Sequence, residues 1–165
     1  MKLKKKPLIL IVDDDPLMVE TIVTIVEESK KYETITAANG YEALERLDQF
    51  KRWGGLAKNK IACIVLDIKM PHMNGLEFLD AWRKSELFFK KIPIVLLTAY
   101  EDKEIWTKAA LLDKGMVSEY FKKPIEDYTQ FTDTLDRILF NNENEFMKDI
   151  IREKARKEVL KYDVE

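Results

Sequence analysis

The sequence predicts an α/β fold in which a parallel β-sheet is covered by helices on both faces. Short apolar runs alternate with longer stretches of helical period, which is typical of repeated βα units. Several of the runs are apolar almost throughout, as in strands that are buried on both faces. The length of 165 residues, with 46% hydrophobic and 35% charged residues, suits one compact domain with some surplus chain.

Five runs are the predicted strands, and each is followed by turn residues or a helix signal. They cover Leu8 to Val12, Glu33 to Ala37, Ile61 to Leu66, Pro93 to Leu97 and Ser118 to Phe121. The run from Ile61 is the most continuous, so we expect it to be the central strand.

Five helices are expected between and after these strands, each with an apolar stripe at three- and four-residue spacing. The first begins at Pro16, the second follows Asn39-Gly40 and ends near Trp53-Gly54-Gly55, and the third begins at Asn74. The fourth should cover Lys103 to Asp113 before Gly115, and the last should turn Phe131, Leu135, Ile138 and Leu139 inward.

Residues 1–140 thus form one predicted domain, and residues 141–165 a C-terminal helical extension that is not an independent domain. Its apolar residues recur at helical spacing among charges. An apolar stripe does not identify its partner, so this helix is expected either to pack on the domain itself or to form a homodimer.

Composition excludes several classes of protein. The net charge of −2 lacks the basic excess of a nucleic-acid-binding surface. No segment reaches transmembrane length, so no membrane partner is expected. The single cysteine, Cys63, has no partner for a disulfide and lies in an apolar run, which favours a structural thiol and a cytoplasmic location.

Polar side chains gather where the predicted strands end. Ligands of open parallel sheets bind at the carboxyl ends of the strands, and those ends carry Asp13 and Asp14, Asp67, Thr98 and Lys123. Three carboxylates in one crevice raise each other's pKa unless a cation shares the site. Magnesium prefers such oxygen ligands, whereas zinc would require a set of Cys and His that is absent.

A carboxylate surrounded by a cation, a hydroxyl and a lysine has the chemistry of a covalent phosphoryl acceptor. Asp67 is the candidate nucleophile, with Thr98 and Lys123 beside it. Taken alone, the aspartates before Pro16 could simply cap a helix, and Asp15 is assigned that role. The joint occurrence of the groups at successive strand ends favours the acceptor site.

Four segments, IVDDDP, VLDIKMPHMNG, PIVLLTAY and EYFKKP, resemble in order the motif regions of response-regulator receiver domains. The resemblance covers about residues 7 to 140. It implies a flavodoxin-like (βα)5 fold, a doubly wound parallel sheet with strand order 2-1-3-4-5, here with the extra C-terminal amphipathic helix.

The resemblance also implies a role for each site residue. Asp67 matches the phosphorylated aspartate and a ligand of Mg2+, Asp14 the acid that binds the metal directly, and Asp13 the acid that acts mostly through water. The backbone carbonyl of Lys69 would complete the metal ligands. Thr98 and Tyr120 match the two switch residues, and Lys123 matches the lysine that pairs with the phosphoryl group, with a cis bond to Pro124.

The implied function is that of a two-component signalling protein. A sensor histidine kinase or phosphotransfer protein would phosphorylate Asp67, since the only histidine, His72, is expected in an exposed loop. Phosphorylation would change a protein-binding face formed by the fourth helix, fifth strand and fifth helix. We expect no direct DNA binding, and no enzymatic activity beyond phosphorylation and dephosphorylation of the chain itself.

Two alternatives remain at this point. The chain could be a constitutive dimerisation module that uses the C-terminal helix. It could also be a phosphatase of the aspartyl-phosphate type, although such enzymes have a second aspartate two residues after the nucleophile, where this sequence has Lys69.

Overall fold

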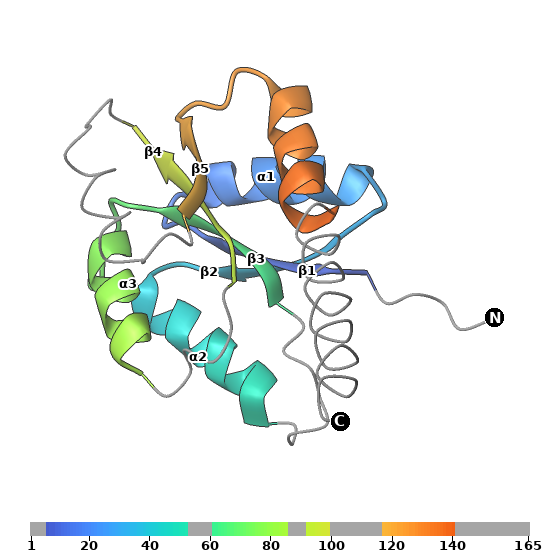
Figure 1. Cartoon of the computed structure of the whole chain (residues 1–165). Helices are drawn as coiled ribbons and strands as arrows, with labels where there is room; N and C mark the ends of the chain where they lie inside the picture. Colours follow the sequence, from blue (N-terminus) through green and yellow to red (C-terminus); the bar gives the residue numbers. More distant parts are fainter. Residues whose placement is uncertain (1–5, 53–60, 86–91, 100–116, 141–165) are drawn as a thin grey trace, which may run out of the picture.

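The computed structural model describes residues 6–52, 61–85, 92–99 and 117–140. Its centre is a five-stranded, all-parallel sheet with the order β2-β1-β3-β4-β5 (Figure 1). The strands are β1 (Leu8–Val12), β2 (Glu33–Ala37), β3 (Ile61–Asp67), β4 (Ile94–Thr98) and β5 (Val117–Lys122). The predicted fold class and strand order are therefore confirmed.

Helices cover both faces of this sheet. The blue helix α1 (Pro16–Glu28) and the orange helix over residues 128–140 lie on one face, and α2 (Gly40–Arg52) and α3 (Gly75–Lys84) lie on the other (Figure 1). Successive side chains of a strand point to opposite faces, so the central strands supply two separate hydrophobic cores. This explains why β1, β3 and β4 are apolar almost throughout instead of alternating.

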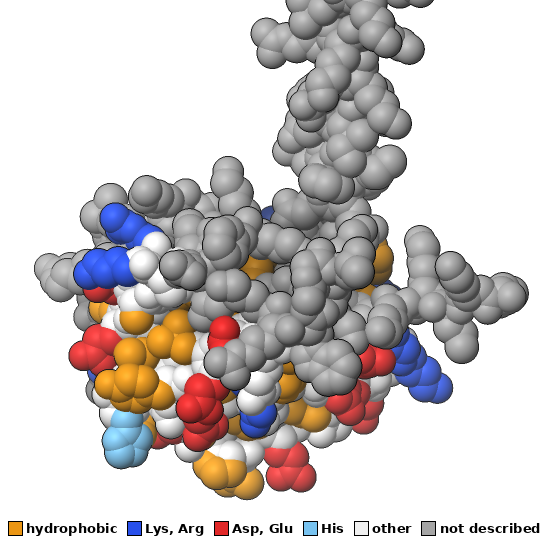
Figure 2. Space-filling view, turned by 90° about the horizontal axis from the view of Figure 1, so that it is seen from below, with side chains coloured by type: hydrophobic (Ala, Val, Ile, Leu, Met, Phe, Trp, Pro, Cys, Tyr) orange, Lys and Arg blue, Asp and Glu red, His pale blue; other side chains and the backbone are white. Residues whose placement is uncertain are grey.

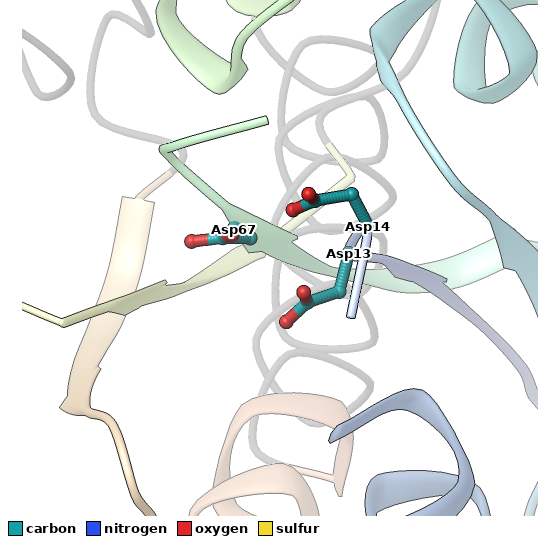
Figure 3. A group of neighbouring side chains, drawn as sticks. All are labelled: Asp13, Asp14 and Asp67. Atoms are coloured by element: carbon teal, nitrogen blue, oxygen red, sulfur yellow. The ribbon is translucent and has the colours of Figure 1, made fainter. Parts of the chain in front are cut away.

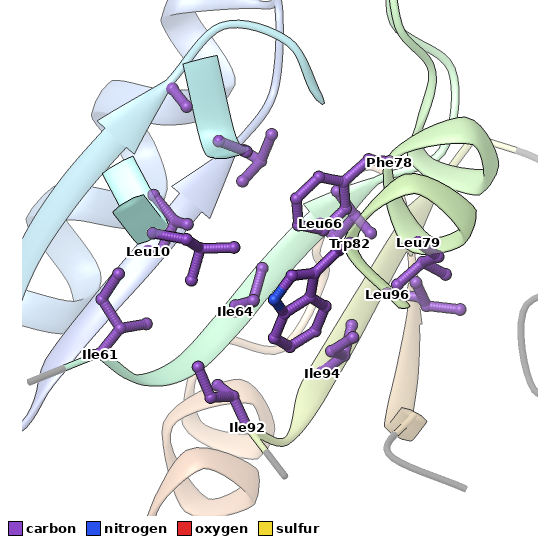
Figure 4. Close-up of a cluster of buried hydrophobic side chains, with 14 of the residues drawn as sticks. Leu10, Ile61, Ile64, Leu66, Phe78, Leu79, Trp82, Ile92, Ile94 and Leu96 are labelled. Atoms are coloured by element: carbon purple, nitrogen blue, oxygen red, sulfur yellow. The ribbon is translucent and has the colours of Figure 1, made fainter. Parts of the chain in front are cut away.

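The core beneath α3 has an aromatic centre. Phe78 and Trp82 are one helical turn apart, both buried, and their rings stack with centroids 5.8 Å apart. Figure 4 shows both side chains between α3 and the strand residues Leu66, Ile64 and Ile94. This packing anchors α3 against β3, the strand that ends in Asp67.

The start of α1 confirms the role assigned to Asp15. Its carboxylate accepts hydrogen bonds from the backbone N–H groups of Leu17 and Met18, as an N-cap residue does. Asp15 is therefore engaged with the helix, while Asp13 and Asp14 remain available at the end of β1.

Most element boundaries agree with those predicted. Strand β5 is one residue longer at each end than predicted, because its pairing with β4 runs from Val117 to Lys122. The predicted fourth helix (103–113) and the C-terminal helix (141–165) lie outside the described residues. None of the described helices is long and apolar enough to cross a membrane.

The face seen in Figure 2 agrees with the modest net charge. In its described part, hydrophobic, acidic and basic side chains are interspersed, and the basic ones form no continuous patch. His72, at a positive φ of 66°, is exposed as predicted.

The buried thiol gives a first testable prediction. Cys63 lies on β3 with no exposed surface, and burial raises its pKa to about 12. Because the thiolate is the reactive form, the native protein should not react with a thiol reagent at pH 8. The unfolded chain should react with one equivalent, measured by absorbance with and without denaturant; fast labelling of native protein would contradict the buried position.

Candidate functional site: an acidic cluster at the sheet edge

The pairing of β1 with β3 brings the predicted carboxylates together. Val12 lies opposite Leu66 in this parallel pair, so the aspartates that follow them emerge side by side. Carboxylate oxygens of Asp13, Asp14 and Asp67 all lie within 4.8 Å of one another. Figure 3 shows the three side chains extending from the ends of the two strands.

The three acids differ in exposure. Asp13 and Asp67 are buried, at 1% and 4% relative exposure, whereas Asp14 is exposed. Neighbouring residues of an extended segment point in opposite directions, so one acid at the end of β1 turns inward and the next outward. The cluster therefore has a buried part and a side open to solvent.

Lys123 is the cation of this cluster. Its Nζ lies 2.6 Å from Oδ2 of Asp13 and 3.0 Å from Oδ2 of Asp67. The backbone N–H of Lys123 donates to the carbonyl of Thr98 over 2.7 Å, which joins the end of β4 to the segment after β5. The peptide bond between Lys123 and Pro124 is cis, as the resemblance implied.

Burial and charge oppose each other at the acceptor. Burial raises the pKa of Asp67, the ammonium of Lys123 lowers it and the nearby carboxylate of Asp13 raises it, and the net result is a raised pKa. For Lys123, burial lowers the pKa, but the two carboxylates outweigh burial and the pKa is raised. Lys123 thus stays protonated, whereas burial makes the ionised form of Asp67 energetically unfavourable.

The other predicted site residues lie around this cluster. Thr98 is buried at the end of β4, next to β3 in the sheet. Tyr120 is half-buried on β5, where it pairs with Leu96 of β4. The backbone N–H of Lys69 donates to Oδ1 of Asp67 over 3.3 Å, and its side chain is exposed.

An open hollow of about 540 Å³ adjoins the cluster. It lies between the segment after β1 and the segment after β3, and Asp14 contributes its exposed carboxylate. The remaining lining residues are Ile68, Lys69, Met70, Pro71, Asn74 and Leu76. A phosphodonor can therefore approach the acids from this side.

The residues present fit a magnesium ion. Three carboxylates against the one positive charge of Lys123 leave two negative charges, which a divalent cation neutralises. All the donors in the cluster are oxygens, the ligand type that magnesium prefers. The donor set thus supports an acidic metal site of the kind expected.

Sequence reasoning missed two glycines next to the site. A Cβ on Gly75 would lie 2.5 Å from the carbonyl oxygen of Asp67, and one on Gly40 would lie 2.5 Å from Cγ of Met73. Each glycine follows an asparagine that caps the same helix and precedes a glutamate by two residues. The repeated pattern Asn-Gly-x-Glu was visible, but it was interpreted only as a turn and helix start.

The raised pKa of Asp67 predicts an effect on stability. A carboxyl whose folded pKa is raised opposes folding once it ionises, so its unfavourable contribution appears as pH rises from the unfolded pKa through the folded pKa. Without Mg2+ at pH 7, Asp67→Asn should therefore raise the free energy of unfolding by about 1 kcal/mol, measured by urea unfolding. The gain should vanish well below the ordinary pKa of aspartate.

Asp80→Asn is the matched control, because Asp80 is a solvent-accessible acid on α3 paired with Lys84. That substitution should change stability by less than about 0.5 kcal/mol. A loss of stability in Asp67→Asn would show that the attraction to Lys123 outweighs burial.

Comparison with known proteins agrees with the fold and the site. The profile of the response regulator receiver domain family matches residues 9–135. Similar sequences include the transcriptional regulatory protein PhoP of alkaline phosphatase synthesis from Bacillus subtilis and hybrid signal transduction histidine kinase D of Dictyostelium discoideum. They are 34% and 37% identical over 119 residues, which is 70% and 72% of this chain but 42% and 7% of the relative.

Among solved structures, the chemotaxis protein CheY4 of Vibrio cholerae is similar, with 26% identity, a TM-score of 0.67 and coverage of 82% of this chain and all of CheY4. The chain spans less than half the length of the two sequence relatives but the whole of the CheY4 chain. The acidic cluster with its lysine, the strand order and the matching profile lead to one conclusion: the chain belongs to the response-regulator receiver domain family.

Proposed function

We propose that Asp67 accepts a phosphoryl group from a sensor histidine kinase or a phosphotransfer protein, in a reaction that depends on Mg2+. The observation that carries this proposal is the pairing of one buried lysine with two buried carboxylates beside a third, exposed one. Such a cluster opposes folding. Clusters of this kind are therefore typical of sites that serve binding or chemistry. The similarity to hybrid signal transduction histidine kinase D supports this class of phosphodonor.

In the proposed reaction, a carboxylate oxygen of Asp67 forms a bond to the phosphorus of a phosphohistidine. The P–N bond breaks, and its electron pair stays on the nitrogen of the protonated imidazole, which leaves as neutral imidazole. Asp67 must be ionised to attack, and Lys123 at 3.0 Å favours that form. In the product, Lys123 pairs with the oxygens of the phosphoryl group.

Asp13, Asp14, Asp67 and the backbone carbonyl of Lys69 would hold the metal. Bound magnesium supplies positive charge to the phosphoryl oxygens. Asp13 and Asp67 contribute oxygens that now face Lys123, and Asp14 contributes from the open side of the cluster. The backbone of Lys69 is suited to this role because its N–H already donates a hydrogen bond to Asp67.

The proposed switch runs through β4 and β5. Thr98 lies at the end of β4 and its carbonyl accepts the N–H of Lys123, so a movement of Thr98 towards the phosphoryl group also affects the segment after β5. Tyr120, the second proposed switch residue, is half-buried on β5. A coupling of about 1–3 kcal/mol is typical of such switches. It is enough to change the affinity of the chain for a protein partner that binds near β4 and β5.

Phosphorylation can be tested by intact mass after incubation with acetyl phosphate and Mg2+. We expect one phosphate-sized addition in the unaltered protein and none in Asp67→Asn or without the metal. Asp80→Asn, which alters a carboxylate on α3 outside the cluster, should still be phosphorylated. An addition that persists in Asp67→Asn would place the acceptor elsewhere and refute the proposal.

Metal binding can be tested by thermal unfolding. A ligand that binds only the folded state stabilises it, by about 2.7 kcal/mol at 100 times its dissociation constant, so Mg2+ should raise Tm by several degrees. Asp14→Ala should abolish most of this rise and leave the Tm of the metal-free protein nearly unchanged, because Asp14 is exposed. An equal rise in both proteins would exclude Asp14 as a ligand.

A further inference from the structure

We propose that residues 37–40, the brace segment, position the metal-binding ends of β1 and β3 relative to each other, and that Gly40 is the critical positioning residue. The inference rests on the proposed function and adds residues that touch neither metal nor phosphate. The brace segment joins the end of β2 to the start of α2. It contacts Asp13 at the end of β1 and the loop that follows Asp67 at the end of β3.

The first contact reaches the end of β1. The backbone N–H of Asp13 donates to the carbonyl of Ala37 over 3.1 Å. Ala37 is buried and is the last residue of β2. This hydrogen bond continues the β1–β2 ladder onto the first acid of the cluster and so fixes the backbone of Asp13.

The second contact reaches the segment after β3. The backbone N–H of Gly40 donates to the carbonyl of Met73 over 3.0 Å. Met73 belongs to residues 68–74, the loop that follows Asp67 and contains Lys69. The brace segment thus bonds at one end to Asp13 and at the other to the loop that follows Asp67 and contains Lys69.

Gly40 also sets how closely this loop approaches α2. An added Cβ would lie 2.5 Å from Cγ and 2.7 Å from Sδ of Met73, and 2.9 Å from Cβ of Phe78. Phe78 is buried and stacks on Trp82, so it has little freedom to withdraw. Any side chain at residue 40 would therefore require Met73 or Phe78 to move.

A displacement at Met73 would reach the acceptor because the end of the loop is bonded to its beginning, next to Asp67. The N–H of Gly75 donates to the carbonyl of Ile68 over 2.9 Å, and its Cα packs against the carbonyl of Asp67. Since the loop is short and closed on itself at Gly75, a shift at Met73 changes the positions of Lys69 and Asp67.

The conformation of the brace segment is itself fixed by side-chain hydrogen bonds. Glu42 accepts from the N–H of Ala38 over 3.0 Å through Oε2, and its own N–H donates to Oδ1 of Asn39 over 3.0 Å. These bonds hold residues 38 and 39 against the start of α2. Glu42 is exposed, so changing it should not disturb the core.

The test compares Mg2+ affinity by titration calorimetry in the unaltered chain and in Gly40→Ala. Loss of a contact that supports metal ligands typically weakens binding 10- to 100-fold, so we expect at least a tenfold loss. Gly40→Ala/Met73→Ala should recover part of it by removing the nearest colliding atoms. Glu42→Ala, which should fold normally, should show a smaller loss in the same direction.

Leu47→Ala is the matched control for general destabilisation. Leu47 is buried on the same helix and belongs to the core cluster, so its truncation should lower Tm without changing Mg2+ affinity. A metal-free measurement completes the test: amide hydrogen exchange at Gly75 should accelerate in Gly40→Ala and stay slow in Leu47→Ala.

The outcomes separate the two hypotheses. If the unaltered chain fails to bind Mg2+, the proposed function fails, and the exchange rates still decide whether Gly40 positions the loop. If it binds and Gly40→Ala binds equally well, the inference alone is overturned. An equal loss of affinity in Leu47→Ala would also overturn it, because the effect would then follow stability.

Discussion

The repulsion between buried carboxylates at one edge of the sheet is the constraint on which the rest of the structure depends. Asp13 and Asp67 are both buried, and a single ammonium group, that of Lys123, pairs with both. The raised pKa of Asp67 shows that this pairing does not fully offset the cost of burial. Stability is sacrificed at this edge, as is common where a site must bind an ion or perform chemistry.

The two hydrophobic cores provide the stability that the site lacks. Every residue of β1 and β4 is buried, and helices on both faces hold the strands in register. The acids therefore follow directly on paired, buried strands, which bring them close together. The residues proposed to move, Thr98 and Tyr120, lie on β4 and β5, on the side of the sheet away from β2.

The loop after Asp67 needs separate support because it has no strand to hold it. Gly75 packs against the beginning of this loop and Gly40 packs against Met73 near its end. Capping hydrogen bonds fix the helix starts at which these two glycines lie. Gly75 approaches the backbone of Asp67, and Gly40 approaches the side chains of Met73 and Phe78, more closely than a residue with a Cβ could. Ligand geometry thus depends on contacts well outside the ligands themselves, as in many metal sites.

The sequence by itself determined the order of strands and helices and the aspartates at the ends of β1 and β3. Those features depend on local periodicity and on strand-end residues, which a single chain displays. The strand order, the switch roles proposed for Thr98 and Tyr120, and the role of each metal ligand came from the family resemblance. Only the tertiary structure decided that Asp13 turns inward while Asp14 stays exposed, that Lys123 contacts both buried acids, and that Gly40 meets Met73. These contacts join residues far apart in the chain, and they depend on register and packing that local patterns do not encode.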